Sequence, residues 1–273
     1  MPKLTTPDQV NLNYTDIGSG RPIVMIHGWP LSGAAFADNA TVLAAAGYRV
    51  ITYDRRGFGQ SGKPRDGYDY DTLAADLDAL LTGLDLHDVV LLGFSMGGGE
   101  VARYLATRGS ERVGAAILSG SICPALCITK DNPDGAMPRE GFQELADACA
   151  ADHAGFVDQF CGWFYSNDQG LTVPEEVRQQ AVEIARQSAP HAAVATILTW
   201  TEDLREDCRR IDVPLLVIHG DGDQNVPLAK SSARMPEYAQ QAQLVVIEGG
   251  PHGINVSHAD QWNAAILSFL AGS

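Results

Sequence analysis

Short runs of apolar residues recur along the chain, and most are separated by segments with apolar residues at helical spacing. The runs span residues 22–26, 48–53, 88–92, 113–118, 214–219 and 243–248, and the helical segments span 34–46, 71–84, 100–108, 228–238 and 258–270. Four large apolar residues in succession, as at 89–92, are typical of a strand buried on both faces. This alternation predicts an α/β fold whose mostly parallel sheet carries helices on both faces.

Two segments depart from this alternation. Residues 10–17 alternate apolar and polar side chains before a Gly-Ser-Gly turn, which indicates a half-exposed strand in an antiparallel hairpin at the sheet edge. From about 122 to 210 the sequence is helix-like, rich in aromatic residues and interrupted by prolines. Because this stretch is too long for a loop, we expect residues 122–210 to be a helical cap inserted after the sixth strand. Residues 1–121 and 211–273 would then form the core.

The charge balance excludes some partners. Thirty-four acidic residues oppose 19 basic ones, a formal net charge of −15, so we expect no nucleic-acid and no membrane partner. The five cysteines are odd in number and have no zinc-like pairing, which favours free thiols and no metal site. With no signal peptide or membrane span in the sequence, we expect a cytoplasmic protein. The sequence leaves open whether the protein forms a homo-oligomer.

A candidate nucleophile follows the apolar run at 88–92. Residues 93–97 read Gly-Phe-Ser-Met-Gly, which places Ser95 between a buried strand and a helical segment. Such a sharp turn crowds the backbone, and the flanking glycines remove Cβ atoms that would collide with strand and helix. The Ser95 hydroxyl is then left accessible at the start of the helix.

A serine hydroxyl needs a neighbouring imidazole as base and a carboxylate to orient that imidazole. In a parallel sheet these groups gather at the carboxyl ends of the strands. His252 lies in a glycine-rich loop just after the last apolar run, whereas His219 falls inside a strand and His87, His153, His191 and His258 lack this placement. Asp223 follows the preceding run and is our choice for the acid. Asp221 stays the alternative, although it is well placed to cap the turn.

The reaction also needs backbone N–H donors for the oxyanion. The elbow supplies that of Met96, immediately after the nucleophile. The second is expected from the loop after residues 22–26, where Trp29 has an N–H and the following Pro30 has none. His27 is then a structural residue of this loop.

Four motifs carry a resemblance to a known family: HGWPLS at 27–32, GYRVITYDRRGFG at 47–59, GYDYD at 67–71 and GFSMG at 93–97. With Ser95, Asp223 and His252 in that order, the whole chain resembles the α/β-hydrolase fold superfamily. Within it, the motifs look like the cofactor-free bacterial haloperoxidases, a group that includes aryl esterases, perhydrolases and γ-lactamases. The resemblance implies an eight-stranded sheet, the same triad, and Trp29 and Met96 as oxyanion donors.

The resemblance also implies an activity. The enzyme would transfer the acyl group of a small-molecule ester or carboxylic acid to Ser95, then to water or hydrogen peroxide, with no cofactor. A γ-lactamase or amidase, a carbon-carbon bond hydrolase and a non-catalytic ligand receptor are the alternatives.

We expect an apolar substrate pocket formed by Phe160, Trp163, Phe164 and Trp200 of the insertion together with Pro30 and Val226. The alternative is that these aromatic residues only fill the cap's own core. Pro30 restricts the conformation of Trp29, which could direct the Trp29 carbonyl into the site. The resemblance associates such a proline with peracid formation, whereas a purely structural Pro30 would only shape the loop.

Overall fold

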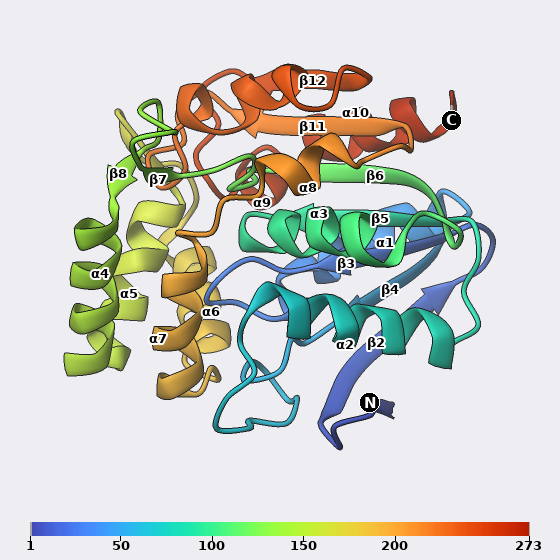
Figure 1. Cartoon of the computed structure of the whole chain (residues 1–273), viewed down its shortest axis with the longest axis horizontal. Coiled ribbons are helices and arrows are strands. Elements are labelled where there is room, and N and C mark those ends of the chain that lie inside the picture. The colour runs from blue at the N-terminus through green and yellow to red at the C-terminus, as the bar shows by residue number, and fades with distance from the viewer. Residues whose placement is uncertain (1, 273) are drawn as a thin grey trace.

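The six apolar runs form six adjacent strands of an eight-stranded sheet in the computed structural model, which describes residues 2–272 (Figure 1). In spatial order the strands are β1 (Lys3–Thr5), β2 (Asn11–Gly18), β4 (Arg49–Tyr53), β3 (Pro22–Ile26), β5 (Val89–Phe94), β6 (Val113–Ser119), β11 (Leu215–Gly220) and β12 (Ala242–Ile247). The strands from β4 to β12 pair in parallel. The predicted mostly parallel sheet is therefore confirmed.

The predicted edge hairpin is also present. Strand β2 pairs antiparallel with both β1 and β4. The alternating pattern of residues 10–17 located β2, but β1 has only three residues and gives no comparable signal. At the centre of the sheet, every residue of β5 is buried, as four consecutive large apolar residues predict.

Helices cover both faces of the sheet (Figure 1). One face carries α2 (Tyr70–Gly83), α3 (Met96–Arg108) and α8 (Arg205–Arg209), and the other carries α1 (Ala37–Ala45), α9 (Ile254–Ser257) and α10 (Ala259–Leu270). The helix expected at 228–238 is instead two 3-10 helices, Leu228–Lys230 and Ser232–Glu237. Pro236 lies inside the second, and a proline has no N–H to continue an α-helix.

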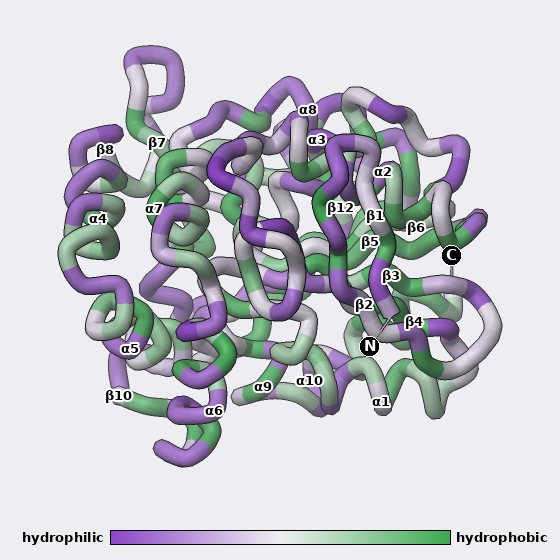
Figure 2. The backbone as a smooth tube through the Cα atoms, turned by 90° about the horizontal axis from the view of Figure 1, so that it is seen from below, coloured by the Kyte–Doolittle hydropathy of each residue, from purple (hydrophilic) through white to green (hydrophobic). Residues whose placement is uncertain are grey.

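Between β6 and β11 the chain forms four helices that lie beyond the carboxyl ends of the strands (Figure 1). They are α4 (Arg139–Ala151), α5 (His153–Phe164), α6 (Glu175–Ala185) and α7 (Pro190–Thr199), with two short ladders formed by β7 (Cys127–Ile128) and β8 (Met137–Pro138) and by β9 (Ser166–Asn167) and β10 (Gly170–Leu171). Hydrophilic turns mark the outer side of this region, whereas the sheet strands are largely hydrophobic (Figure 2).

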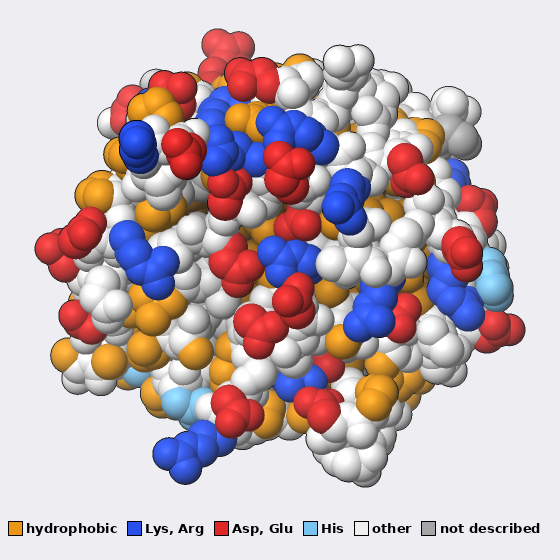
Figure 3. Space-filling view, viewed as in Figure 1, with side chains coloured by type: hydrophobic (Ala, Val, Ile, Leu, Met, Phe, Trp, Pro, Cys, Tyr) orange, Lys and Arg blue, Asp and Glu red, His pale blue; other side chains and the backbone are white. Residues whose placement is uncertain are grey.

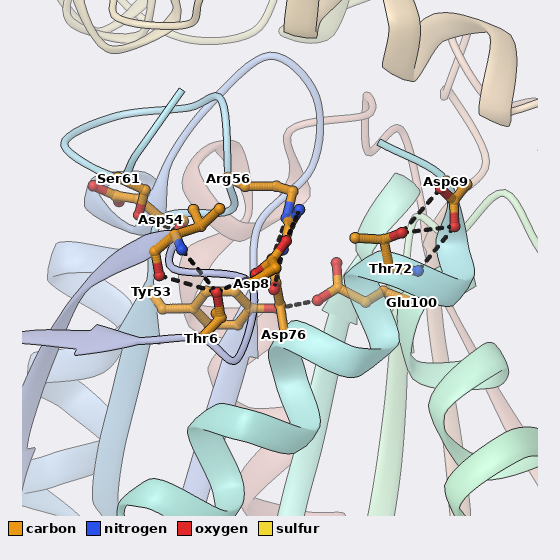
Figure 4. A network of polar contacts seen from close by, with 11 residues as sticks. Thr6, Asp8, Tyr53, Asp54, Arg56, Ser61, Asp69, Thr72, Asp76 and Glu100 are labelled. Carbon is orange, nitrogen blue, oxygen red and sulfur yellow. Dashed lines mark hydrogen bonds and ion pairs between the residues drawn. The ribbon is translucent and has the colours of Figure 1, made fainter. Parts of the chain in front are cut away.

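Polar contacts fasten the loops around the sheet. Arg56 is buried and contacts Asp76 of α2 at 2.5 Å and Asp8 of the N-terminal segment at 2.9 Å (Figure 4). Asp69 caps α2 by accepting the Thr72 N–H at 2.9 Å.

On the face seen in Figure 3, acidic and basic side chains are interspersed. No helix within residues 2–272 has the length and apolar character to cross a membrane.

Candidate active site

Ser95 occupies the sharp turn between β5 and α3. Its backbone has φ +54° and ψ −119°, a region that residues other than glycine rarely adopt. The strain is offset by hydrogen bonds, because the Ser95 N–H donates to Ser119 O at 2.8 Å and its carbonyl accepts the Gly98 N–H at 3.0 Å. The chain thus holds a serine that is 6 % exposed in a fixed orientation at the end of the central strand.

The glycines of the motif are required by close backbone contacts. A Cβ at Gly93 would lie 2.4 Å from Gly97 O, and one at Gly97 would lie 2.5 Å from Ile26 O. Gly28 is equally constrained, because a Cβ there would lie 2.9 Å from the Cβ of Ser95. These contacts bring the strand, the helix and the loop after β3 together around Ser95.

His252 reaches Ser95 from the loop that follows β12. Its Nε2 lies 2.9 Å from Ser95 Oγ, and its Nδ1 lies 2.6 Å from Asp223 Oδ2. Nδ1 faces a carboxylate oxygen and therefore carries the ring proton, which leaves Nε2 to accept a hydrogen bond from the serine hydroxyl. The structure thus brings together the three residues that the sequence placed in the triad.

Asp223 lies in the turn after β11, and its side chain is fully buried. Its Oδ1 accepts the N–H groups of Asn225 at 2.9 Å and Val226 at 2.8 Å. Burial alone would raise the pKa of Asp223, but the charge of His252 and hydrogen bonds from His219 and His252 hold this pKa well below its usual range. Asp223 is therefore ionised wherever His252 can act as a base.

Asp221, the alternative acid, has a different position. Its Oδ1 accepts the Gly249 N–H at 2.6 Å, and the residue is exposed. This contact joins the turn after β11 to the turn after β12, so Asp221 braces the two loops that carry Asp223 and His252.

His219 is a polar residue beside this triad to which the sequence assigned no role in the site, because it falls inside a strand. It lies in β11, is fully buried, and places Nε2 at 2.8 Å from Val226 O and 3.0 Å from Asp223 Oδ2. Its position four residues before Asp223 is the only signal in the sequence. That signal becomes interpretable only once the turn after Gly220 is known to fold Asp223 back over the strand end.

The two candidate oxyanion donors lie in segments that adjoin Ser95. Met96 is the first residue of α3, so its N–H has no acceptor within that helix. Among residues 2–272, no hydrogen bond engages the N–H or the carbonyl of Trp29. The Trp29 indole donates instead to Ala193 O of α7 at 3.0 Å, which ties this loop to the cap helices.

A buried polar network supports the loop that carries Trp29. Arg55 donates from Nε to Glu100 of α3 at 2.9 Å, from Nη2 to His27 O at 2.9 Å, and from its backbone N–H to His27 Nε2 at 2.9 Å. Tyr53 donates to the other oxygen of Glu100 (Figure 4). Burial, followed by the charge of Arg55, keeps the pKa of His27 well below its ordinary value, so its ring is neutral and Nδ1 donates to Gly28 O at 2.8 Å.

A cavity of about 310 Å³ opens beside Ser95 and His252. Of the predicted pocket residues, Phe160, Trp163, Trp200 and Val226 line it, and the other lining side chains are mostly apolar. Such a cavity suits a small, largely apolar ligand.

Phe164 and Pro30 do not line this cavity, contrary to the prediction. Phe164 is the last residue of α5 and packs its ring against Phe94 and His252, which leaves it only 2 % exposed. Pro30 is buried in its loop, whereas the neighbouring Trp29 indole packs edge-on against the cavity residues Phe160 and Trp200.

Comparison with known proteins agrees with this fold. The α/β-hydrolase fold family model matches residues 21–259. The chain is 40 % identical to a non-heme chloroperoxidase of Kitasatospora aureofaciens over 99 % of each chain, and 33 % identical to a bifunctional esterase/perhydrolase of Acinetobacter calcoaceticus over 98 % of each. The structure of a bromoperoxidase from Bacillus anthracis matches with a TM-score of 0.96 at 39 % identity, covering 99 % of each chain.

The chain therefore belongs to the α/β-hydrolase fold family and is an enzyme of that class. The resemblance to the bacterial haloperoxidases, first seen in the motifs around Trp29 and Ser95, is confirmed by these relatives.

Proposed function

We propose that this protein hydrolyses small carboxylic esters through an acyl-enzyme on Ser95. The observation that carries the proposal is a continuous series of hydrogen bonds. Ser95 Oγ lies 2.9 Å from His252 Nε2, and His252 Nδ1 lies 2.6 Å from Asp223 Oδ2. Ser95 and His252 also line the cavity. A serine, an imidazole and a carboxylate in this order are the groups that nucleophilic acyl transfer needs.

The chemistry follows from the position of each proton. Ser95 Oγ attacks the ester carbonyl while His252 Nε2 takes its proton, and Asp223 stabilises the imidazolium that forms. The N–H groups of Met96 and Trp29 donate to the oxyanion. The imidazolium then gives its proton to the departing alcohol, which leaves an acyl group on Ser95. Water, deprotonated by His252, attacks this acyl group, and the imidazolium returns the proton to Ser95 Oγ as the bond to the acyl group breaks and the acid leaves.

Hydrogen peroxide is the second acceptor that we propose. If peroxide replaces water, the same step releases a peracid, with the same proton transfers and no cofactor. The names of the relatives, chloroperoxidase and esterase/perhydrolase, support this activity. The Trp29 carbonyl, with no hydrogen bond from the described residues, is the group that could accept one from bound peroxide.

We also propose residues 122–210 as the cap domain and residues 1–121 with 211–273 as the core. The proposal is supported by helices α4 to α7, which lie beyond the carboxyl ends of the strands and of which α4 and α5 contribute cavity residues. A cytoplasmic location is proposed as well, because all five cysteines are free and buried, as a reducing compartment favours.

The test is the Ser95→Ala variant, assayed with p-nitrophenyl acetate and with a panel of esters, lactams and substrates for carbon-carbon bond hydrolysis. We expect ester turnover to fall on the order of 10⁴-fold while the protein stays folded. Phenylmethylsulfonyl fluoride is expected to label the wild type at Ser95 and to leave the variant unlabelled. Near-normal turnover by the folded variant would exclude the covalent mechanism, and a wild type inactive on every substrate of the panel would favour a ligand receptor.

A further inference from the structure

Two histidines contact the same oxygen of Asp223. His252 Nδ1 lies 2.6 Å from Oδ2 and His219 Nε2 lies 3.0 Å from it, while the backbone N–H groups of Asn225 and Val226 occupy Oδ1. A carboxylate has about four lone-pair sites, so each site of this buried carboxylate faces a donor. Among residues 2–272, the contact with His219 is therefore the one side-chain restraint on Asp223 besides that from His252.

The protonation of His219 follows from its neighbours. Nε2 faces two acceptors, Val226 O at 2.8 Å and Asp223 Oδ2, so this nitrogen carries the proton. Nδ1 lies 2.7 Å from Ser232 Oγ, and that hydroxyl has no other described hydrogen-bond partner. Ser232 is thus placed to donate to Nδ1, which leaves Nε2–H of this fully buried ring as the donor that faces Asp223.

The contacts form a chain of five side chains: Ser95, His252, Asp223, His219 and Ser232. Its two halves share one oxygen atom, and only the Ser95 half reaches the cavity. The Ser232 half starts in the second 3-10 helix and is anchored by strand β11, which pairs with β6 on one side and β12 on the other. It thus links the Asp223 side chain, which belongs to a turn, to a rigid element.

We propose that His219 is a positioning residue for ester cleavage: it holds Asp223 Oδ2 in place for His252 and touches no substrate. The inference rests on the proposed function of the triad. A carboxylate held from both sides keeps the His252 ring in one orientation as it gains the proton from Ser95. Loss of His219 would then act on the chemical step and leave substrate binding unchanged.

The first comparison is His219→Leu with His219→Gln, assayed on p-nitrophenyl acetate with folding followed by circular dichroism. We expect His219→Leu to lower kcat roughly tenfold to a hundredfold, the size of one hydrogen bond to a charged group, with little change in KM. Glutamine retains an N–H donor near the position of Nε2, so His219→Gln is expected to recover most of kcat. The matched control is His153→Leu, which removes a histidine bonded to the Ser188 hydroxyl at 2.9 Å outside the triad and is expected to retain kcat.

The second comparison separates positioning from general destabilisation. In an Asp223→Ala background, His219→Leu is expected to cause no further loss of kcat, because the residue through which His219 acts is gone. Should His219→Leu fail to fold, Ser232→Ala replaces it, with an expected several-fold loss of kcat that likewise disappears in the Asp223→Ala background.

These two comparisons distinguish a positioning role of His219 from a merely structural one. An unchanged kcat in folded His219→Leu or Ser232→Ala, or an equal loss with and without Asp223, overturns the positioning role. These outcomes are distinct from failure of the triad itself, which Ser95→Ala reports independently.

Discussion

The ring of Phe164 packs edge-on against the ring of His252, with centroids 4.9 Å apart and an interplanar angle of 87°. The backbone repeats the contact, because the Gly253 N–H donates to Phe164 O at 2.8 Å. The end of α5 is thus fastened to the loop of the proposed base, whereas Phe160 and Trp163 of the same helix line the cavity. One helix of the insertion thus contacts the proposed base and lines the cavity beside it.

This division predicts different effects along one helix. We expect Trp163→Ala and Phe160→Ala to redistribute kcat/KM among short- and long-chain esters, because they change the cavity wall. Phe164→Ala is expected to lower kcat for all esters by a similar factor, since it loosens His252. Rates on a series of p-nitrophenyl esters measure both effects, and a uniform loss in all three variants would mean that these aromatic residues serve only packing.

Substitution of the two aspartates after β11 is expected to lower kcat to different extents. Asp223→Asn leaves His252 without a carboxylate and is expected to lower kcat roughly 10³- to 10⁴-fold. Asp221→Asn keeps an acceptor for the Gly249 N–H and is expected to cost much less. Because the pKa of Asp223 is held below its usual range, Asp223 stays ionised above pH ~4, so a fall of kcat/KM between neutral pH and pH ~4 does not come from protonation of this carboxylate. The reverse ranking of the two variants would assign the acid to Asp221.

The lowered pKa of His27 predicts that the free energy of unfolding depends on pH. The folded-state pKa lies well below the unfolded value of ~6.5 because the ring is buried and close to Arg55. Below pH ~6.5 the unfolded chain binds a proton that the folded chain does not, so the free energy of unfolding falls by up to about 1.4 kcal/mol per pH unit. Urea denaturation at pH 7 and pH 5 measures this slope. We expect a shallower slope in His27→Gln and no change in the control His87→Gln, an exposed histidine; equal slopes in all three proteins would contradict the assignment.

Pro30 is expected to affect the choice between water and peroxide. The proline restricts Trp29, whose carbonyl has no hydrogen bond from the described residues, and a freer Trp29 would present that carbonyl less well to peroxide. Pro30→Leu is therefore expected to lower the ratio of peracid formation to p-nitrophenyl acetate hydrolysis several-fold. Both rates are measured in the same preparation with acetate and peroxide, and a parallel change in both would leave Pro30 only a structural role.

The sequence by itself determined the sheet and the elbow. Buried strands such as 89–92 and the glycines at 93 and 97 are local signals, because burial on both faces needs a continuous apolar run and the sharp turn excludes a Cβ at those positions. The order of Ser95, Asp223 and His252 followed from where parallel strands end. In contrast, the helix predicted over 228–238 is divided at Ser231 into two 3-10 helices, and Pro236 lies inside the second.

Only the tertiary structure decided which side chains meet. Asp221 and Asp223 are separated by one residue, and the turn after Gly220 alone sends one to Gly249 and the other to His252. The same turn folds Asp223 back onto His219, which the strand pattern had marked only as buried. Phe160 and Phe164 are one helical turn apart, yet the docking of α5 gives one to the cavity and the other to His252. These choices depend on contacts between segments far apart in the sequence, and local patterns of polarity do not encode them.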